Sequence, residues 1–459
     1  MDISKISINR NESIKKAMSA IDHAGTRICF IVDDDKKFIG VVTDGDIRRR
    51  IIEGIDISRP VGEIANKDSI TAKKDFSDEQ MIALAKTREG VNEIPVLDSE
   101  GRLAGVASVS GIINKKSSFL TEDEKKTMKH GKERILIIGG AGYIGSILSR
   151  MLLGNGYKAR VMDNLLLGDH GIKELYTDED FEFMKGDARN IHDVVKAVIG
   201  SDAVVLLAGI VGDPACSLDP ITTVESNYLA TKMIAEVCRH HQVNRLIFAS
   251  TCSTYGIGKD VLDENSPLNP VSLYARSKID SEKALLSMVD DNFSPTIFRL
   301  ATVYGYSPRM RFDLVVNTLT AKAVKEGKMQ IFGGTQWRPL VHVADIADAF
   351  IRCLKAPIED VRGQIFNLGS SEQNYQILKL GEIVKEMIPG AELEILKEDA
   401  DKRDYNVSFE KIRKVLGFTP KNTIKSAVLE IRKAFDDGLI DDHNDKKYSN
   451  YKLLKEGNE

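Results

Sequence analysis

Tyr274 and Lys278, in the stretch VSLYARSKID, are the residues whose types and spacing best suit proton chemistry. A spacing of four residues places the two side chains one turn apart on the same face of a helix. A phenol ordinarily titrates at about pH 10, but a nearby ammonium and a cationic nicotinamide both favour the phenolate. Tyr274 can therefore act as a base near neutral pH if a dinucleotide lies beside it.

A glycine-rich stretch, RILIIGGAGYIGSILS, has the pattern of such a dinucleotide site. Its apolar, β-branched start, residues 135–138, predicts a strand covered on both faces. Gly140, Gly142 and Gly145 fit the spacing G-x-G-x-x-G. The wider spacing G-x-x-G-x-x-G starts at Gly139 and uses the same last two glycines. A side chain in this turn would hold a pyrophosphate away from the amide N–H groups and from the N-terminus of the following helix.

An acidic residue follows at the distance expected for ribose binding. The apolar segment 157–162 ends at Asp163, which lies 18 residues after Gly145. A carboxylate there can accept hydrogen bonds from both ribose hydroxyls, and it would repel a 2′-phosphate. No basic residue follows directly, since Asn164 and Leu165 come next. The sequence therefore predicts that NAD binds rather than NADP. Together with the Tyr–Lys pair, this predicts an enzyme that reversibly oxidises an alcohol.

Strands and helices alternate after Asp163. Apolar strand patterns occur in FEFMKGDARN, AVVLLAGIVG, NRLIFASTCSTYG and TIFRLATVYG. This alternation predicts an α/β fold, a doubly wound parallel Rossmann sheet with a smaller C-terminal substrate-binding part. The tail from Asp436 onward is charged, with interspersed Tyr and Leu residues, and fits either a disordered end or a segment packed on this domain.

The chain has the length of two or three domains and the composition of a globular protein. Its 459 residues are 42% hydrophobic with a formal net charge of −4, which gives no reason to expect a nucleic acid or an anionic membrane as partner. No apolar run reaches the roughly 18 residues of a membrane helix, and the polar N-terminus has no secretory signal. The five cysteines include no C-x-x-C pair, and the eight histidines form no ligand-spaced cluster. We therefore expect a cytoplasmic protein with reduced thiols and no metal.

Residues 1–115 carry an internal repeat with a period of 65. Each copy reads helix, strand, turn, strand and helix, as in the first-copy segments IKKAMSAIDHAG, RICFIVD, KKFIGVV and TDGDIRRRII. Two copies of such a small unit usually bury their apolar faces against each other. The matched positions are Gly25 with Gly90, Ile31 to Asp33 with Val96 to Asp98, and Gly40 with Gly105.

This repeat resembles a tandem pair of CBS domains, a regulatory module of α+β fold that often binds adenine nucleotides. In GVVTDGDIRR, Thr43 and Asp46 fit the family's ribose-binding pattern G-x-x-T-x-x-D. The second copy, GVASVSG, keeps Ser108 but has Gly111 in place of the acid. The resemblance implies one site for AMP or ATP, and a dimerisation and packing module without a ligand is the alternative. Residues 116–133 are charged and poor in large apolar side chains, so we expect a linker there.

Residues 134 to about 435 resemble an extended short-chain dehydrogenase/reductase of the nucleotide-sugar epimerase and dehydratase class, and we assign residues 134–459 to this domain. The resemblance implies that Tyr274 takes the proton of a sugar hydroxyl and that Lys278 holds the nicotinamide ribose. Thr251, 23 residues before Tyr274, matches the Ser or Thr that hydrogen-bonds the same oxygen. The implied partners are a nucleotide-diphosphate sugar and further copies of the chain, in a homodimer or higher homo-oligomer.

Further positions match the family's cofactor and substrate contacts. GDA corresponds to an adenine-contacting Gly-Asp-x, and LLAG lies along the cofactor in relatives. Guanidinium groups suit a diphosphate because they bind its oxygens bidentately. The implied cofactor contacts are Gly139, Gly142, Tyr143, Ile144, Gly145, Asp163, Asn164, Asp187, Ala188, Leu207, Ala208, Gly209, Asn227 and Lys278. The implied substrate contacts are Thr302, Asn317, Arg338 and Arg403. Many relatives have Asn where Thr302 stands, so the resemblance leaves the nucleotide open.

The residues beside Thr251 discriminate between reactions. Sugar 4,6-dehydratases of this fold carry Thr-Asp-Glu, because removal of water needs a further acid and base, and the related decarboxylases carry Glu at the third position. This chain has Thr251, Cys252 and Ser253. Cys252 lies one residue out of register with the catalytic Cys of epimerase-reductases, so we expect it to be packed rather than catalytic. With dehydration, decarboxylation and cysteine-dependent epimerisation disfavoured, the triplet predicts oxidation and re-reduction at one carbinol. This is the reaction of a C4 epimerase with a transient 4-keto sugar.

Two alternatives stay open. A nucleotide-sugar 4-ketoreductase or a 4,6-dehydratase-like oxidoreductase would consume or produce NADH, whereas an epimerase would not. A nucleotide sensor without catalysis would use the NAD-binding sheet and the CBS pair for signalling only. For an epimerase, family analogy implies a role in surface polysaccharide biosynthesis.

Overall fold

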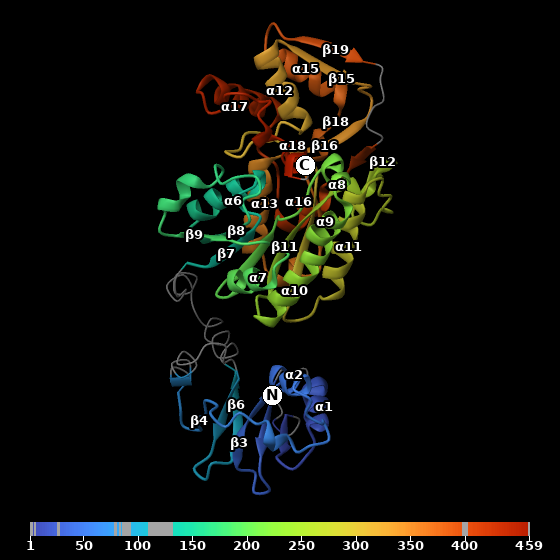
Figure 1. Ribbon diagram of the computed structural model, residues 1–459. Coiled ribbons are helices and arrows are strands. Elements are labelled where there is room, and N and C mark those ends of the chain that lie inside the picture. Colours follow the sequence, from blue (N-terminus) through green and yellow to red (C-terminus); the bar gives the residue numbers. More distant parts are fainter. Residues whose placement is uncertain are drawn as a thin grey trace. The chain divides into compact units, whose positions relative to one another are not determined.

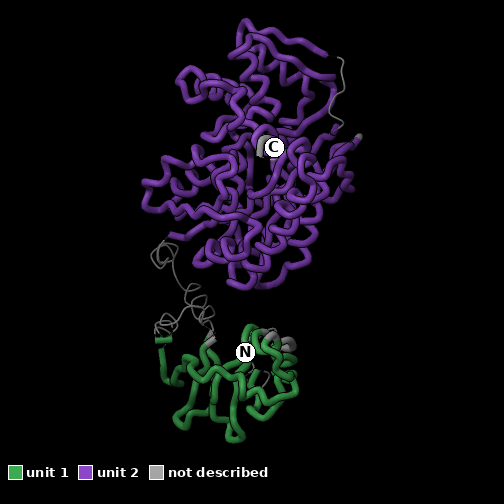
Figure 2. The backbone as a smooth tube through the Cα atoms, in the orientation of Figure 1, with its two compact units in different colours: residues 1–130 green, residues 131–459 purple. Residues whose placement is uncertain are grey.

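The computed structural model divides into two compact units, residues 1–130 and residues 131–459 (Figure 2). The structure describes residues 3, 6–24, 28–77, 80–81, 84, 93–108, 132–396 and 403–457. Most of the predicted linker, residues 116–131, lies outside the described residues, as do Gly25, Gly90 and Gly111.

The first repeat of unit 1 folds in the order that its sequence predicts. Its elements are β1 (Ser7–Asn9), α1 (Ile14–Ala24), β2 (Ile28–Val32), β3 (Phe38–Thr43), α2 (Asp44–Ile52) and the short 3-10 helix η2 (Val61–Glu63). Apolar side chains from the two helices and from one face of the β2–β3 hairpin form one core, in which Ile14, Ile31, Val42 and Ile47 are almost completely buried. The two helices therefore pack on the sheet through the faces that carry these residues.

The second repeat reproduces the hairpin of the first. It contains β4 (Ala72–Lys73), β5 (Glu93–Leu97) and β6 (Leu103–Ser108). Ile31 pairs with Gly40 in the first hairpin and Val96 pairs with Gly105 in the second, and in each the register shifts directly after this pair. The period of 65 residues is thus present in the strand register. The copies also bond to each other, because the amide of Phe38 donates to the carbonyl of Gly101 over 3.0 Å.

A seven-stranded sheet forms the centre of unit 2, and all of its neighbouring strands run parallel. The predicted doubly wound sheet is confirmed. Its spatial order is β17 (Ile365–Leu368), β13 (Ser294–Leu300), β11 (Arg245–Thr251), β10 (Ala203–Leu206), β7 (Arg134–Ile138), β8 (Lys158–Asp163) and β9 (Phe181–Lys185).

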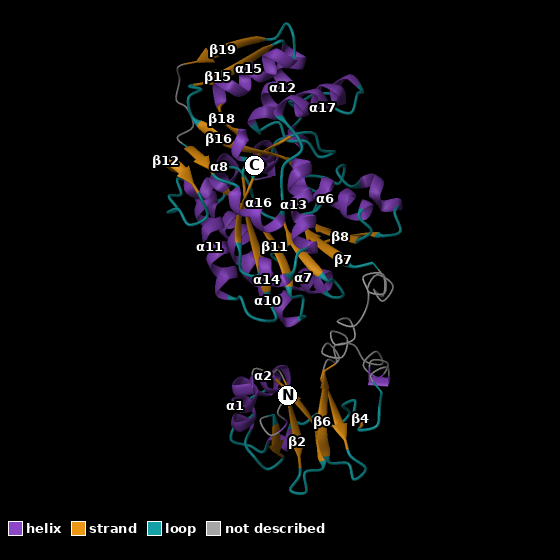
Figure 3. Cartoon of the chain, turned by 180° about the vertical axis from the view of Figure 1, so that it is seen from behind, coloured by secondary structure: helices purple, strands orange, loops and turns teal. Residues whose placement is uncertain are grey.

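Helices cover both faces of this sheet (Figures 1 and 3). On one face α6 (Tyr143–Gly154) and α13 (Val343–Lys355) pack together, and on the other α10 (Ala230–His240) packs between α7 (Ile191–Val198) and α11 (Leu273–Ser287). The strands contribute alternate residues to two separate cores, with Ile135 and Ile137 in one and Leu136 and Ile138 in the other. Burial on both faces explains why these strands read as continuous apolar runs.

The order of the strands reverses at β7. The chain continues from β7 to β8 and β9 on one side, and then crosses to β10, β11, β13 and β17 on the other. Loops that leave β7 and β10 therefore diverge to opposite faces, and this opens a crevice at the carboxyl ends of the strands where ligands of such sheets bind.

The C-terminal part of unit 2 adds small sheets and helices above this crevice. Its strands are β12 (Ile257–Leu262) with β20 (Asp404–Val407), β15 (Lys328–Phe332) with β19 (Glu392–Leu396), and β14 (Thr302–Tyr304) with β16 (Trp337–His342) and β18 (Asn374–Gln376). The helices α12 (Val315–Glu326), α15 (Ile377–Met387) and α17 (Ile424–Asp436) share a core with β14, β15 and β16.

Shorter elements connect these parts. They are α8 (Asp213–Leu218), α9 (Pro220–Val224), the π-helical turn η4 (Glu225–Leu229), α14 (Ile358–Val361), α16 (Glu410–Leu416) and the 3-10 helices η3 (Lys173–Thr177), η5 (Cys252–Tyr255) and η6 (Ser371–Gln373). The described part of the chain contains no helix long and apolar enough to cross a membrane.

The tail is packed on unit 2, which decides between the two alternatives for it. After α17 it forms the 3-10 helix η7 (Lys446–Tyr448) and the helix α18 (Asn450–Gly457), which contacts α8. Tyr448 is 4% exposed, and its ring meets that of Phe312 edge-on with 5.4 Å between centroids.

Candidate active site

A cavity of about 1080 Å³ lies at the carboxyl ends of the central strands and continues under the C-terminal part. Its volume exceeds the roughly 300–1,000 Å³ of a site for one drug-sized ligand, which leaves room for a dinucleotide and a second ligand. The cavity brings together the three predicted catalytic residues and all predicted cofactor and substrate residues except Asn227 and Asn317.

The glycine turn between β7 and α6 forms one end of the cavity through close backbone packing. A Cβ on Gly139, whose φ is +86°, would lie 2.6 Å from the amide nitrogen of Ala208. A Cβ on Gly145 would lie 2.5 Å from Cα of Gly140. Gly142 caps α6 without a side chain, so the first N–H groups of the helix are not covered by a capping group. This turn fits a pyrophosphate because nothing larger than hydrogen separates it from the helix N-terminus.

Asp163, the last residue of β8, is held in place beside this turn. Its Oδ2 accepts a hydrogen bond from the amide of Ala141 (3.0 Å) and its Oδ1 accepts one from the amide of Leu165 (2.9 Å). Burial raises the pKa of Asp163, and these two bonds act in the opposite direction. At the end of the next strand, Asp187 pairs with Arg189 (2.8 Å), and hydrogen bonds from Arg189 lower the pKa of Asp187.

Asn227, which the family resemblance places on the cofactor, is fully buried behind the cavity wall. Its Oδ1 accepts from the amide of Ile210 (2.8 Å) and its Nδ2 donates to the carbonyl of the same residue (2.9 Å). Both ends of the amide are therefore used, and Asn227 supports the cavity-lining loop at Gly209 rather than lining the cavity itself.

Asn317, expected at the substrate, has a similar role. It is fully buried, and its Oδ1 accepts from the amide of Gly305 (3.0 Å). Its Nδ2 donates to the carbonyl of Arg311 (3.0 Å) and to the hydroxyl of Tyr143 (3.1 Å). The side chain of Asn317 therefore holds the loop before α12 instead of facing the cavity, in contrast to the prediction.

The predicted catalytic residues converge from two elements. Tyr274 lies in the first turn of α11, which Ser272 caps by accepting from the amide of Ala275 (3.2 Å), and Lys278 follows one turn later. The ammonium of Lys278 donates to the carbonyl of Ala249 (2.9 Å). Burial lowers the pKa of Lys278 to about 8.

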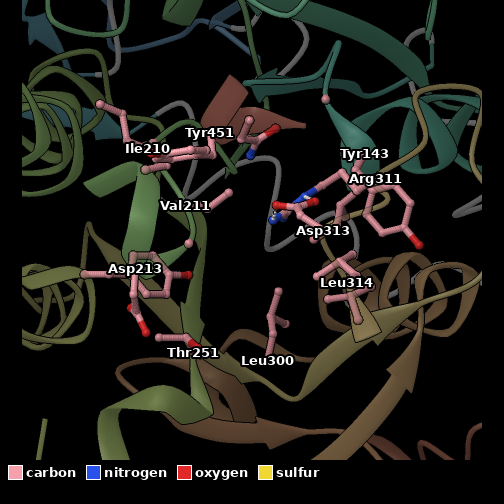
Figure 4. Close-up of a pocket in the computed structure, with 18 of the residues that line it drawn as sticks. Tyr143, Ile210, Val211, Asp213, Thr251, Leu300, Arg311, Asp313, Leu314 and Tyr451 are labelled. Atoms are coloured by element: carbon pink, nitrogen blue, oxygen red, sulfur yellow. Dashed lines mark hydrogen bonds and ion pairs between the residues drawn. The ribbon is translucent and has the colours of Figure 1, made fainter. Parts of the chain in front are cut away.

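Tyr274 faces Thr251, the last residue of β11. Burial raises the pKa of the Tyr274 phenol, whereas the charge of Arg311 and the hydrogen bond with Thr251 act to lower it. Figure 4 shows Thr251 on one side of the cavity and Arg311 on the other. The charges of Cys216 and Asp213 act in the same direction as burial, so the pKa of Tyr274 stays above its usual value. A general base at this position therefore needs a further cation beside the phenol, which an oxidised nicotinamide would supply.

The two residues after Thr251 supply no carboxylate. Cys252 is 1% exposed, and its thiol donates to the carbonyl of Arg299 over 3.2 Å. Burial raises the pKa of this thiol, so it stays protonated. Ser253 lines the cavity. Cys252 is therefore packed in the core, as expected from its position one residue out of register with the catalytic Cys of epimerase-reductases.

Charged residues that sequence analysis missed complete the far side of the cavity. Arg311 binds Asp313 through two bonds of 3.0 and 2.7 Å, and both residues line the cavity from the loop before α12. Asp213, the first residue of α8, lies 3.4 Å from the guanidinium of Arg403. An Arg and an Asp two residues apart in RFDLVVN were a usable signal, because two opposite charges beside an apolar run often form a local pair.

The predicted arginines lie next to each other. Arg338, in β16, donates to the carbonyl of Trp337 (2.7 Å) and to the carbonyl of Arg403, and both arginines line the cavity. Thr302 lines the cavity from the start of β14.

Comparison with known proteins agrees with this geometry. The model of the "NAD dependent epimerase/dehydratase family" matches residues 135–369, and the CBS domain model matches residues 1–53 and 61–118. A UDP-glucose 4-epimerase of Lactobacillus helveticus is 29% identical over 312 residues, which are 63% of this chain and 92% of the relative. UDP-glucuronic acid decarboxylase 1 of Arabidopsis thaliana is 26% identical over 332 residues, which are 68% of this chain and 72% of the relative.

A solved structure gives the same result for the fold. The UDP-glucuronic acid 4-epimerase of Bacillus cereus, in complex with UDP-glucuronic acid and NAD, superposes with a TM-score of 0.61 and 25% identity. The match covers 66% of this chain and 99% of the epimerase. Sheet, glycine turn and Tyr–Lys pair define a dinucleotide-dependent enzyme of the short-chain dehydrogenase/reductase type. The chain belongs to the NAD-dependent epimerase/dehydratase family and carries CBS domains at its N-terminus. NAD, predicted from Asp163, is the cofactor of this family.

Proposed function

We propose that unit 2 is a nucleotide-sugar C4 epimerase that works through a transient 4-keto sugar. The observation that supports this most is the set Thr251, Tyr274 and Lys278 in one cavity, with a buried thiol and a hydroxyl as the two residues after Thr251. Oxidation and re-reduction of a carbinol need one base and one hydride acceptor, and these residues supply the base.

In this proposal Tyr274 takes the proton from the hydroxyl on C4 of the sugar. Thr251 hydrogen-bonds the same oxygen, and the ammonium of Lys278 favours the phenolate. NAD bound along the glycine turn would supply the hydride acceptor for oxidation of C4 and the hydride donor for its re-reduction. Tyr274 then gives the proton back, so the residue ends each cycle as it began. The wide cavity lets the sugar turn between the two steps.

Arg338 and Arg403 would hold the diphosphate of the substrate. Both guanidinium groups lie on the C-terminal side of the same cavity, and guanidinium binds phosphate oxygens bidentately. Thr302 would contact the substrate between them and Tyr274.

A panel of UDP-, GDP-, CDP- and dTDP-sugars, incubated with the protein without added cofactor, tests the proposal. Proton NMR of the sugar ring should show two C4 epimers interconverting, with no change in the absorbance of NADH. Turnover that requires added NADH, or a 4-keto sugar as the final product, would contradict it.

One observation favours a ketoreductase or dehydratase-like oxidoreductase as the second candidate. Asp213 lines the cavity near Tyr274, and its Oδ1 is buried with no hydrogen-bond partner among the described residues. A carboxylate there can act as the further acid or base that removal of water needs. Asp213→Asn should leave C4 epimerisation within about tenfold of wild type, whereas a dehydratase would lose its activity.

For unit 1 we propose that an adenine nucleotide binds at Thr43 and Asp46 and regulates unit 2. Thr43 caps α2 by accepting from the amide of Asp46 (3.1 Å), and the carboxylate of Asp46 accepts from the Thr43 hydroxyl (2.7 Å). Asp46 also pairs with Arg49 (2.6 Å), so a ribose would replace existing bonds of this carboxylate. Calorimetry of the full chain with AMP and with ATP tests the site. Heat in wild type that disappears in Asp46→Asn supports it, and absence of heat in wild type refutes it.

A further inference from the structure

Arg309 is a buried cation that forms no ion pair within the described part of the chain. It is 1% exposed, and no carboxylate among the described residues lies within ion-pair distance of it. Its Nη2 donates to the side-chain oxygen of Asn450 (2.6 Å), whereas its Nε is buried and has no hydrogen-bond partner within the described part of the chain. A buried guanidinium is unfavourable unless an anion compensates it, so its position calls for a ligand.

The side chain of Arg309 starts beside the glycine turn. A Cβ on Gly171 would lie 2.8 Å from Cβ of Arg309 and 3.0 Å from the carbonyl oxygen of Ala141. The absence of a side chain at Gly171 therefore lets Arg309 approach the loop that leads into α6. Arg309 lines the same cavity as Gly142 and Tyr143 at the start of this helix.

Arg309 remains charged at neutral pH despite its surroundings. Burial and the charge of Arg311 lower the pKa of Arg309 to about 10, while the charges of Asp313 and Asp163 act in the opposite direction. Asp313 pairs with Arg311 and is within ion-pair distance of no other arginine among the described residues. The loop before α12 thus brings two arginines but one carboxylate to the cavity wall.

The C-terminal segment 446–457 supplies the partner of Arg309. The amide of Phe312 donates to the carbonyl of Tyr448 (3.1 Å), and this bond and their ring contact fix the segment on the loop of Arg309. Asn450 follows at the start of α18 and is 6% exposed. Figure 4 shows Tyr451 of the same helix at the end of the cavity where Ile210 lies. The partner is an amide, so it orients the guanidinium and leaves its charge available.

We propose that Arg309, held by Asn450, binds the diphosphate of the dinucleotide, and that the C-terminal segment 446–457 thereby retains the cofactor between turnovers. The position of Arg309 beside the start of α6 favours the dinucleotide over the other diphosphate in the cavity, that of the nucleotide sugar. The proposal rests on NAD as cofactor and does not depend on which sugar reaction follows.

Binding measurements on the full chain test this. Dissociation constants for NAD and for UDP, GDP, CDP and dTDP are measured by fluorescence titration, and the NAD content of purified protein is measured after acid release. Arg309→Met should raise the Kd for NAD about ten- to hundredfold, because a charge-assisted hydrogen bond is lost. The Kd of the nucleoside diphosphate that wild type binds should stay the same.

Substitutions in α18 separate charge from packing. Asn450→Asp should weaken NAD binding about as much as Arg309→Met, because the new carboxylate would pair with the guanidinium. Asn450→Ala should have a smaller effect. Lys455→Met removes an exposed cation from the same helix and should change nothing.

Unchanged NAD content and Kd in both Arg309→Met and Asn450→Asp would overturn the proposal. An increase confined to the Kd of the nucleoside diphosphate would overturn it too, since the ligand of Arg309 would then be the substrate. If Arg309→Met does not fold, Asn450→Asp and a chain that ends at Ser449 replace it as test variants. Their NAD content and their Kd for NAD are then compared with wild type. A wild-type chain without affinity for NAD would refute the cofactor assignment itself.

Discussion

The two halves of the cavity are built in different ways. The half proposed to receive the dinucleotide is built mainly from backbone and small residues in turns after consecutive strands, as at Gly139 and Gly145, with Asp163 and Arg309 as its charged side chains. The opposite half consists of charged side chains from loops and strands far apart in the chain, among them Arg311, Arg338 and Arg403. Backbone contacts bind what all dinucleotides share, whereas long charged side chains can differ between related enzymes and select the substrate.

This comparison predicts different responses to substitution. A Cβ in the glycine turn meets backbone atoms that cannot move, so changes there should remove cofactor binding. Loss of one guanidinium in the opposite half should leave the cofactor in place and weaken the substrate alone. Tyr274 lies between the halves and should affect neither kind of binding.

The largest effect is expected for Tyr274→Phe. Loss of the base should lower kcat by about 10²- to 10⁴-fold, while NAD content and the KM for the nucleotide sugar stay close to wild type. Steady-state kinetics and acid release of NAD measure these quantities. Tyr176→Phe is the control, since Tyr176 is 43% exposed and does not line the cavity. A Tyr274→Phe variant that has lost turnover but keeps its biological output would support the non-catalytic sensor instead.

Gly145→Ala should come next. Its Cβ would lie 2.5 Å from Cα of Gly140, and relief of such an overlap costs about 1–3 kcal/mol. We expect about a ten- to hundredfold rise in the Kd for NAD. Gly154→Ala, in the same helix and with nothing within 4 Å of the added Cβ, should bind NAD like wild type. If the two variants had the same Kd for NAD, the glycine turn would not bind the cofactor through close backbone packing, and the distinction between the two halves would fail.

Arg403→Met should have a moderate effect on the other half only. Loss of one guanidinium from the diphosphate site should raise the KM for the nucleotide sugar about tenfold, with NAD content unchanged. Arg432→Met serves as control, because it removes an exposed guanidinium whose one ion pair within the described residues is with Asp436 at 3.7 Å. Loss of NAD from Arg403→Met would show that the halves are not independent.

The smallest effect concerns the pH dependence of stability. Burial lowers the pKa of Lys278 to about 8 in the folded chain, against about 10.4 for an unfolded chain. Between these values the unfolded chain binds more protons, so wild type should gain about 1 kcal/mol of stability per pH unit relative to Lys278→Met. Urea unfolding of cofactor-free protein at pH 7, 8 and 9 measures this. Lys283→Met, on the exposed side of α11, should follow wild type, and a flat difference for Lys278→Met would contradict the account.

The sequence predicted the cofactor half because its residues lie close together in the chain. The run 135–138, the glycine spacing, Asp163 and the Tyr–Lys pair are local patterns, and a parallel sheet brings the ends of its strands together. The direction of a polar side chain is not local. Asn227 and Asn317 both lie beside the cavity, yet backbone groups of neighbouring loops take up their amides.

The contacts of the C-terminal part were less predictable because they join distant segments. Arg309 and Asn450 are separated by 141 positions, and nothing in either neighbourhood indicates the other. The tail reads as charged and irregular, although Tyr448 anchors it in an aromatic cluster. Such pairs arise only when the whole C-terminal part has folded.

The central proposal for this cavity is that it acts on the C4 carbinol of a nucleotide sugar and on no other carbon. The most direct test is to run the reaction in D₂O with the sugar that the panel identifies, and to locate deuterium in the product by NMR and mass spectrometry. We predict two C4 epimers without deuterium at C5. Deuterium at C5, or a product that has lost water or carbon dioxide, would show that a further acid and base take part and would contradict the proposed C4 epimerase.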